Sequence, residues 1–170
     1  MNSAKKLLMF LLVLILAAAG PALAQSAGTS PEGFHWEIGE EGLLISGYEG
    51  SSRELTIPAE IDGHPVRAIG EEAFAESQLS RVSLPNSLIS IGAGAFYDNQ
   101  LGEITIPASV TYIGTGAFMY NPLIRVSLGA NVQLGSWVFG NGFEALYNNS
   151  ARAAGTYARP NAESRDWARR

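Results

Sequence analysis

The sequence predicts a β-rich, right-handed solenoid with repeats of about 22 residues, short strands, and a cap at each end. Three observations support this prediction. A hexad recurs at a nearly constant step, a short alternating block lies upstream of each hexad, and the chain contains no cysteine. Because no disulfide can stabilise so small a chain, its stability has to come from a repeated core.

The hexad begins with isoleucine or leucine followed by glycine, and it ends in phenylalanine. Its four copies lie at residues 69–74, 91–96, 113–118 and 134–139, with steps of 22, 22 and 21 residues. One such unit cannot bury its apolar side alone, whereas stacked copies enclose a continuous core. We therefore expect the terminal phenylalanines to form a row along the stack. They are Phe74, Phe96, Phe118 and Phe139.

The upstream block alternates apolar and polar residues, as in Val82-Ser83-Leu84. Alternation with a period of two predicts a short strand with two side chains pointing inward. The blocks begin at residues 55, 82, 104 and 126, and proline follows the first three. Proline ends each strand because it has no backbone donor. The glycine at the second hexad position allows a tight corner.

The pattern Leu-x-x-Val-x-Leu-Pro-x-Ser-Leu-x-x-Ile-Gly-x-x-Ala-Phe at residues 79–96, repeated at 101–118, resembles the BspA-like leucine-rich repeats. The resemblance covers roughly residues 43–143, and residues 154–157 are similar to the family's C-terminal ending. The first unit has two extra residues within 62–65, a turn sequence. The resemblance implies a leucine-rich repeat protein that attaches to host or microbial surface proteins.

The chain departs from the family three residues after each repeat phenylalanine, where the family often has cysteine. Ser77, Asn99 and Asn121 occupy these positions. Asparagine there can bond the backbone of the adjacent turn, so we expect the fold to tolerate the change. Without cysteine, the chain has no thiolate metal site and no cysteine nucleophile.

The first 24 residues have the three parts of a secretory signal peptide. Lys5 and Lys6 are a basic start, residues 7–19 are apolar, and Ala-Leu-Ala precedes Gln25. The alternative is a membrane anchor, but a helix needs roughly 20 apolar residues to span a bilayer. We expect cleavage after Ala24 and a protein that is secreted or on the cell surface, with the periplasm as another exported location.

The predicted organisation has five parts. Residues 1–24 are the signal peptide, 25–33 a linker, 34–54 an N-terminal cap hairpin, 55–143 about four repeat turns, and 144–170 a C-terminal cap or tail. Gly39-Glu40-Glu41-Gly42 between two alternating stretches predicts the hairpin. For the last part, a closed cap and a partly disordered Arg-bearing tail are both consistent with the sequence.

After signal cleavage the chain would have nine Arg and no Lys against sixteen Asp and Glu, a net charge of −7. Phosphate recognition needs clustered basic side chains, so we expect no nucleic-acid partner. No second long apolar run follows the signal peptide, so we expect no membrane insertion after cleavage. His35 and His64 are the only histidines. We expect His35 in the N-terminal cap and His64 in the turn of the first repeat, too far apart to share a metal or a catalytic role. With no zinc or phosphate-loop spacing, the sequence predicts no catalytic residue, cofactor or metal.

Two surfaces are candidate binding sites. The first, the strand face, has a charged column and a hydroxyl column of outward strand residues. The charged column is Glu54, Arg81, Glu103 and Arg125, and the hydroxyl column is Thr56, Ser83, Thr105 and Ser127. One interpretation is a structural charge ladder, with about 0–1 kcal/mol for each exposed pair. The other is a polar recognition face.

The second surface follows the repeat phenylalanines and contains Tyr97, Met119 and Tyr120. Tyrosine and methionine are enriched at protein interfaces, so this patch is the alternative docking site. Packing between neighbouring turns is the simpler explanation for it. Taken with the resemblance, the pattern predicts a non-catalytic protein that mediates protein binding or adhesion. A structural envelope or periplasmic protein without a dedicated ligand is the alternative function.

Overall fold

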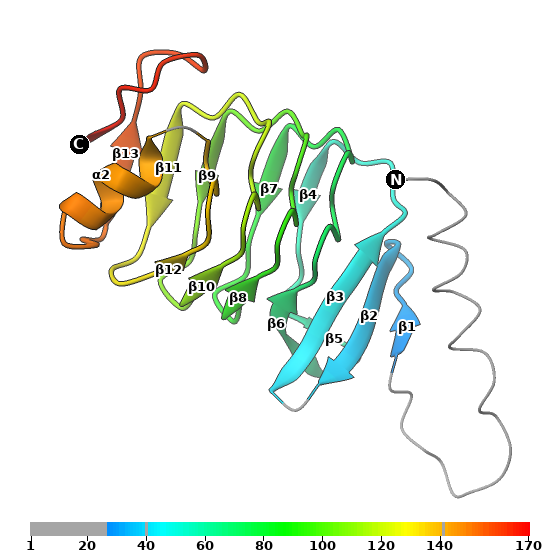
Figure 1. Cartoon of the computed structure of the whole chain (residues 1–170). Helices are drawn as coiled ribbons and strands as arrows, with labels where there is room; N and C mark the ends of the chain where they lie inside the picture. The colour runs from blue at the N-terminus through cyan, green and yellow to red at the C-terminus, as the bar shows by residue number, and fades with distance from the viewer. Residues whose placement is uncertain (1–26, 40, 141) are drawn as a thin grey trace, which may run out of the picture.

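The computed structural model describes residues 27–39, 41–140 and 142–170 (Figure 1). Within them every regular element except one short helix is a strand, and the chain winds through about four stacked turns, so the predicted solenoid is confirmed. The predicted signal peptide and its cleavage site lie outside the described residues. The right-handed sense of the winding stays a prediction.

One side of the stack consists of the strands predicted upstream of the hexads. They are β4 (Glu54–Thr56), β7 (Arg81–Ser83), β9 (Glu103–Thr105) and β11 (Arg125–Leu128). β4 pairs with β7 and β9 pairs with β11, both in parallel, and β7 lies next to β9. In each of the four strands the second residue is apolar and buried, while the first is exposed. The period of two therefore sets the inside and outside of this sheet.

A second side of the stack consists of strands that enter the hexads. They are β6 (His64–Ile69), β8 (Ser90–Ile91), β10 (Tyr112–Ile113) and β12 (Gln133–Leu134), paired in parallel in that order. Three of the four are only two residues long. The first hexad residue points inward in each turn, and Ile69, Ile91 and Ile113 are buried. The two strand sides are visible in Figure 1.

The predicted row of phenylalanines is confirmed. The ring centroids of Phe74 and Phe96 are 5.1 Å apart, those of Phe96 and Phe118 are 5.1 Å apart, and those of Phe118 and Phe139 are 5.2 Å apart. Neighbouring ring planes differ by 4°, 9° and 15°. The separation is close to the spacing of paired strands, about 4.8 Å. Each ring therefore repeats the position of the previous ring one turn further along.

The asparagines that replace the family's cysteines bond adjacent turns, as predicted. The amide of Asn99 donates to the carbonyl of Phe74 at 2.8 Å and accepts from the backbone N–H of Leu79 at 2.9 Å. Asn121 makes the same two bonds one turn later, to Phe96 and Leu101. Each asparagine thus satisfies buried backbone groups of the preceding turn.

The glycine at the second hexad position has a steric role. An ideal Cβ on Gly92 would lie 2.6 Å from the backbone nitrogen of Glu71, and one on Gly114 would lie 2.5 Å from that of Ala93. Any side chain here would collide with the backbone of the preceding turn. The repeated glycine therefore allows the turns to approach within strand-pairing distance.

The N-terminal hairpin lies against the first turn. Its strands are β2 (Phe34–Gly39) and β3 (Gly42–Tyr48), which pair antiparallel, and β3 pairs in parallel with β6. The extra residues of the first unit also form a turn, because β5 (Glu60–Ile61) pairs antiparallel with β6. Asp62 and Gly63 at its tip have positive φ values of 51° and 77°.

The predicted linker needs a correction, because Ala27–Thr29 form strand β1, which pairs antiparallel with β2. This stretch is too short to show alternation, so the sequence pattern did not indicate a strand. The indole of Trp36 covers Gly28 so closely that a Cβ there would lie 2.8 Å from its ring. A small residue is thus required for β1 to pack on β2.

Residues 142–170 fold against the last turn. They form α2 (Phe143–Asn149), β13 (Gly155–Ala158) and β14 (Ala168–Arg169). β13 pairs antiparallel with β11, and β14 pairs antiparallel with β13. Phe143 continues the aromatic row, with its ring 4.6 Å from that of Phe139. Tyr157 and Trp167 contact Phe143 edge-on and close this end of the core.

Candidate functional site

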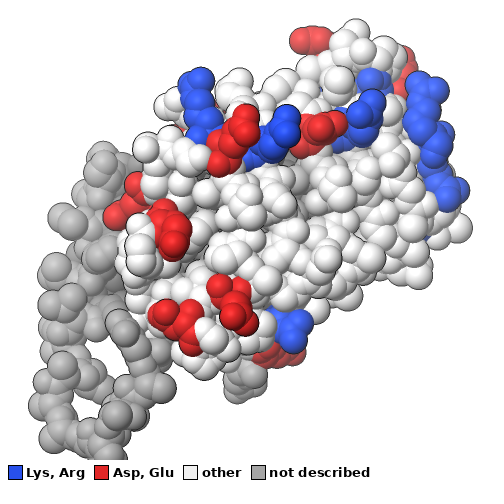
Figure 2. All heavy atoms as spheres, turned by 180° about the vertical axis from the view of Figure 1, so that it is seen from behind, with Lys and Arg blue, Asp and Glu red and all other residues white. Residues whose placement is uncertain are grey.

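The strand face presents its charged column in register. Glu54 is opposite Arg81, Glu103 is opposite Arg125, and all four side chains are exposed. Figure 2 shows a line of alternating basic and acidic groups along one edge of the molecule. Since acids and bases alternate, the column has no net charge of its own.

A single ion pair joins two members of this column. The Nη1 atom of Arg125 lies 3.3 Å from Oε2 of Glu103, and both side chains are more than half exposed. Water screens such a pair, so it contributes about 0–1 kcal/mol. The geometry therefore favours the structural interpretation of the charged column over recognition of a charged partner.

The hydroxyl column runs beside the charged one. Thr56, Ser83 and Thr105 are exposed, whereas Ser127 is half-buried. The Oγ atom of Ser127 lies 2.8 Å from Oγ1 of Thr156, which extends the column onto β13. Sequence reasoning did not include Thr156, because the repeat ends before it. The result is an uncharged row of hydroxyl groups beside the charged column.

The second predicted surface separates into packed and exposed parts. Tyr97 and Met119 are half-buried, but Tyr120 is 61 % exposed. The rings of Tyr97 and Tyr120 meet edge-on, with centroids 5.1 Å apart and 83° between their planes. Packing between neighbouring turns accounts for Tyr97 and Met119. It does not account for the exposure of Tyr120.

Sequence reasoning missed Trp137, which is 53 % exposed. It is the fourth residue of its hexad, where the second and third copies have Gly94 and Gly116. All three have positive φ, at 61°, 59° and 65°. This backbone region favours glycine and is an outlier for a bulky side chain. The signal was available in the alignment of the hexads, as a tryptophan in a column that otherwise contains Gly94, Gly116 and Glu72.

Trp137 adjoins the patch that was predicted. A Cβ on Gly116 would lie 3.9 Å from the Cβ of Met119, so the fourth hexad position borders the residue after the phenylalanine. The carbonyl next to Trp137, that of Ser136, accepts a bond from the N–H of Gly116. We define the aromatic turn surface as Tyr97, Met119, Tyr120 and Trp137.

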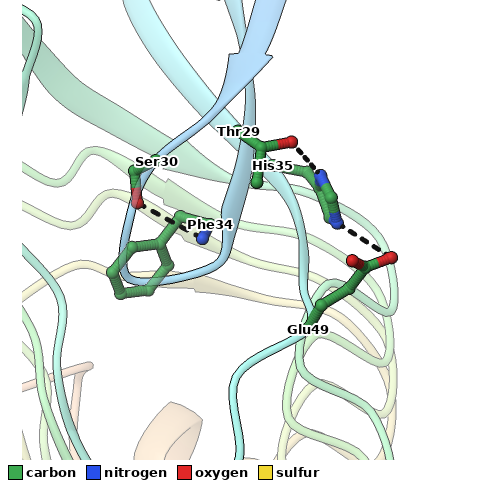
Figure 3. A network of polar contacts seen from close by, with 5 residues as sticks. All are labelled: Thr29, Ser30, Phe34, His35 and Glu49. Carbon is green, nitrogen blue, oxygen red and sulfur yellow. Dashed lines mark hydrogen bonds and ion pairs between the residues drawn. The ribbon is translucent and has the colours of Figure 1, made fainter.

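A polar network ties the N-terminal strands together (Figure 3). The Nδ1 atom of His35 lies 2.8 Å from Oγ1 of Thr29, and its Nε2 atom lies 3.2 Å from Oε1 of Glu49. Phe34 donates its backbone N–H to Oγ of Ser30 at 3.4 Å. The network links β1, β2 and the residue after β3, which is a structural role.

Two further structural findings concern metals and membranes. Within residues 27–39, 41–140 and 142–170, no three His, Asp or Glu side chains are grouped so that they could hold a metal ion. In the same part of the chain, no helix has the length and apolar character needed to span a bilayer.

Residues 48–149 match the model of the BspA type leucine rich repeat region, in six copies. The chain belongs to the BspA-type leucine-rich repeat family. Leucine-rich repeat families are generally non-catalytic, and their surface members commonly bind other proteins. No curated protein matches the chain.

Two solved structures of bacterial leucine-rich repeat proteins are similar to this chain. A leucine rich cell surface protein from Faecalibacterium prausnitzii A2-165 is 26 % identical, with a TM-score of 0.54 over 72 % of this chain. The match spans 35 % of that protein, about a third of its length. A leucine-rich repeat protein from Bacteroides capillosus ATCC 29799 is 28 % identical, with a TM-score of 0.48, covering 62 % of this chain and all of that one.

Proposed function

We propose that this chain is an exported, non-catalytic protein that binds other proteins at the cell surface, in adhesion, through its aromatic turn surface. The observation that supports this most directly is the exposure of Tyr120 and Trp137. Tyrosine and tryptophan are the residues most enriched among those that dominate binding energy at protein interfaces. The cell-surface relative from Faecalibacterium prausnitzii supports the location.

Folding alone gives no reason for Trp137. A residue in a sparsely populated backbone region costs of order 1–3 kcal/mol, and strain of this kind clusters at functional sites. Gly94 and Gly116 occupy the same position without that cost, and they have the same positive φ. An indole that is strained, half in solvent and replaceable by glycine is more consistent with binding than with stability.

The strand face is the second candidate surface. In its hydroxyl column, Thr56, Ser83 and Thr105 are exposed to solvent. If neither surface binds a partner, the alternative function applies: a structural envelope or periplasmic protein without a dedicated ligand.

A binding screen against extracellular-matrix proteins and whole cells tests the proposal. We expect Tyr97→Ala with Tyr120→Ala to abolish binding, while Arg81→Glu with Arg125→Glu leaves it intact and changes stability by about 1 kcal/mol or less. Loss through the arginine pair instead would move the site to the strand face. No binding to any target would favour the structural alternative.

Processing tests the proposed export. Protein recovered from an exporting host is expected to begin at Gln25, as read by N-terminal mass spectrometry. A membrane-embedded chain that retains Met1 would contradict export with cleavage.

A further inference from the structure

The turn segments of the repeats have charge of one sign only. The hexads and the residues that follow them, at 69–78, 91–100, 113–122 and 134–142, contain four acids and no Lys or Arg. The acids are Glu71, Glu72, Glu76 and Asp98, and each is exposed. Across the part of the chain that the structure describes, the ion pairs are His35–Glu49 and Arg125–Glu103. None of the four acids is therefore neutralised by a salt bridge.

These acids adjoin the aromatic turn surface. The point where Gly94 would carry a Cβ lies 3.2 Å from Cγ of Glu72 and 3.8 Å from Cβ of Tyr97. The backbone N–H of Glu76 donates to the carbonyl of Tyr97 at 2.9 Å. Partial burial raises the pKa of Tyr97, and Tyr120, Asp98 and Glu76 raise it further. The first two turns thus present carboxylates, and the second to fourth present aromatic rings.

We propose that this surface binds an extended polypeptide segment carrying Arg or Lys beside apolar residues, an inference that rests on the proposed function. Carboxylates form charge-assisted hydrogen bonds with guanidinium and ammonium groups. The faces of Tyr and Trp attract the same cations, most strongly when water is displaced. From the first to the fourth turn the stack covers about 15 Å, the length of four to five residues of extended chain.

The acidic charge of the turn segments distinguishes a basic polypeptide from other kinds of partner. An anionic segment would be repelled by these four carboxylates, which form no salt bridge with any residue that the structure describes. A neutral glycan would stack on Tyr120 and Trp137 without needing Glu72, Glu76 or Asp98. Dependence on the acids and on salt therefore distinguishes a basic polypeptide from both.

Trp137 provides a direct reporter of occupancy. The chain has three tryptophans, and Trp36 and Trp167 are 3 % and 7 % exposed, against 53 % for Trp137. Acrylamide, a neutral quencher, should reach Trp137 far more readily than the other two. The probes are a synthetic peptide of about six residues that alternates Arg and Leu, and its counterpart with Glu in place of Arg.

We expect the Arg peptide to protect Trp137 from acrylamide and to lose affinity roughly tenfold between low and high salt, because salt screens exposed charges. The Glu peptide should give no protection. Calorimetry should show roughly tenfold lower affinity for the Arg peptide in the triple variant Glu72→Gln, Glu76→Gln, Asp98→Asn. The matched control, Glu54→Gln with Glu103→Gln on the strand face, should change affinity by less than about twofold.

Trp137→Gly separates binding from folding. It should lower the affinity for the Arg peptide roughly tenfold. The melting temperature should stay the same or rise, since glycine prefers this φ. Equal binding of both peptides, equal loss in the strand-face control, or salt-independent protection by a neutral glycan would overturn the inference. If neither peptide binds while Tyr120-dependent binding to cells persists, the basic partner is wrong and the proposed function stands. If binding to cells does not depend on Tyr120 and Trp137, the proposed function itself is wrong.

Discussion

The interior turns and the terminal segments of this protein bury aromatic rings in different ways. Inside the stack, Phe96 lies nearly parallel to Phe74 and Phe118, at 4° and 9°. At the ends the rings tilt: Phe34 meets Phe74 at 73°, and Phe139 meets Phe143 at 60°. Identical neighbours allow one geometry to repeat, whereas a chain that has to close the core needs different residues and different angles.

This difference indicates where stability depends on coupling between turns and where it depends on single contacts. Each interior turn contacts a copy of itself on both sides, so a defect there is felt by two neighbours. The terminal segments depend instead on individual contacts, such as the hydroxyl of Tyr147, which donates to the carbonyl of Gly129 and accepts from the N–H of Val132. Substitutions in the interior turns and in the terminal segments should therefore differ in how much stability they remove and in how that loss depends on pH.

The largest effect is expected from Phe118→Ala. The ring is 1 % exposed between Phe96 and Phe139, so truncation should leave a cavity and cost about 3–5 kcal/mol. Phe34→Ala should cost less, since Phe34 has ring partners, Tyr48 and Phe74, on one side of the stack. Denaturant melts of both variants measure the contrast. If Phe118→Ala melts like the parent, the stacked row does not stabilise the turns.

A smaller loss is expected from Asn99→Ala. The substitution leaves the buried N–H of Leu79 and the carbonyl of Phe74 without their side-chain partner, at a cost of about 2–3 kcal/mol. The matched control is Ser77→Ala in the first turn, where the Oγ of Ser77 donates to the carbonyl of Ala75 in its own turn. That change should cost under about 0.5 kcal/mol. Equal melting midpoints for the two variants would show that the asparagine does not couple turns.

The C-terminal segment should be sensitive to alkali. Burial raises the pKa of Tyr147 and of Tyr157 above the ordinary value. The folded state therefore holds these protons more tightly than the unfolded chain, whose tyrosines titrate near pH ~10. The resulting stability is present below that pH and is lost as pH rises through the folded values. Melts across the alkaline range should show this decline, and Tyr147→Phe should flatten it. An unchanged slope in that variant would contradict the assignment.

The smallest effect is expected at the surface of the interior turns. Arg125→Ala removes the exposed pair with Glu103 and should change stability by less than about 1 kcal/mol. High salt should abolish even that difference. A loss as large as that from Asn99→Ala would mean that the charged column stabilises the stack substantially.

The repeated part of the fold was predictable because its residues obey one period. Matching the upstream blocks to one another predicted that Glu54 lies opposite Arg81 and Glu103 opposite Arg125, and both registers are observed. The period of the hexads predicted the phenylalanine row, and the resemblance to leucine-rich repeats predicted the asparagine bonds. Each depends on the identity of successive turns, which sequence comparison within the chain detects directly.

What lies outside the period was harder to predict. Ala27–Thr29 has no alternation, and α2 begins at Phe143 without a polar cap residue, after Gly142 with a φ of 85°. Trp137 occupies a regular position with an irregular residue, so a search for similarity passed over it. The candidate site was predicted only in part for that reason. Residues that are the same in every repeat build the fold, whereas residues that differ between repeats, such as Trp137, form the candidate binding surface.

The close approach of backbone at Gly92 and Gly114 has a mechanical consequence. It holds successive turns about 4.8 Å apart, while the 22 residues of one turn would extend to roughly 75 Å. A chain pulled from its two ends would therefore lengthen by about 70 Å for each turn that peels away. Because each turn contacts only its neighbours, these releases would come one at a time, and a tethered protein of this kind would yield gradually under load.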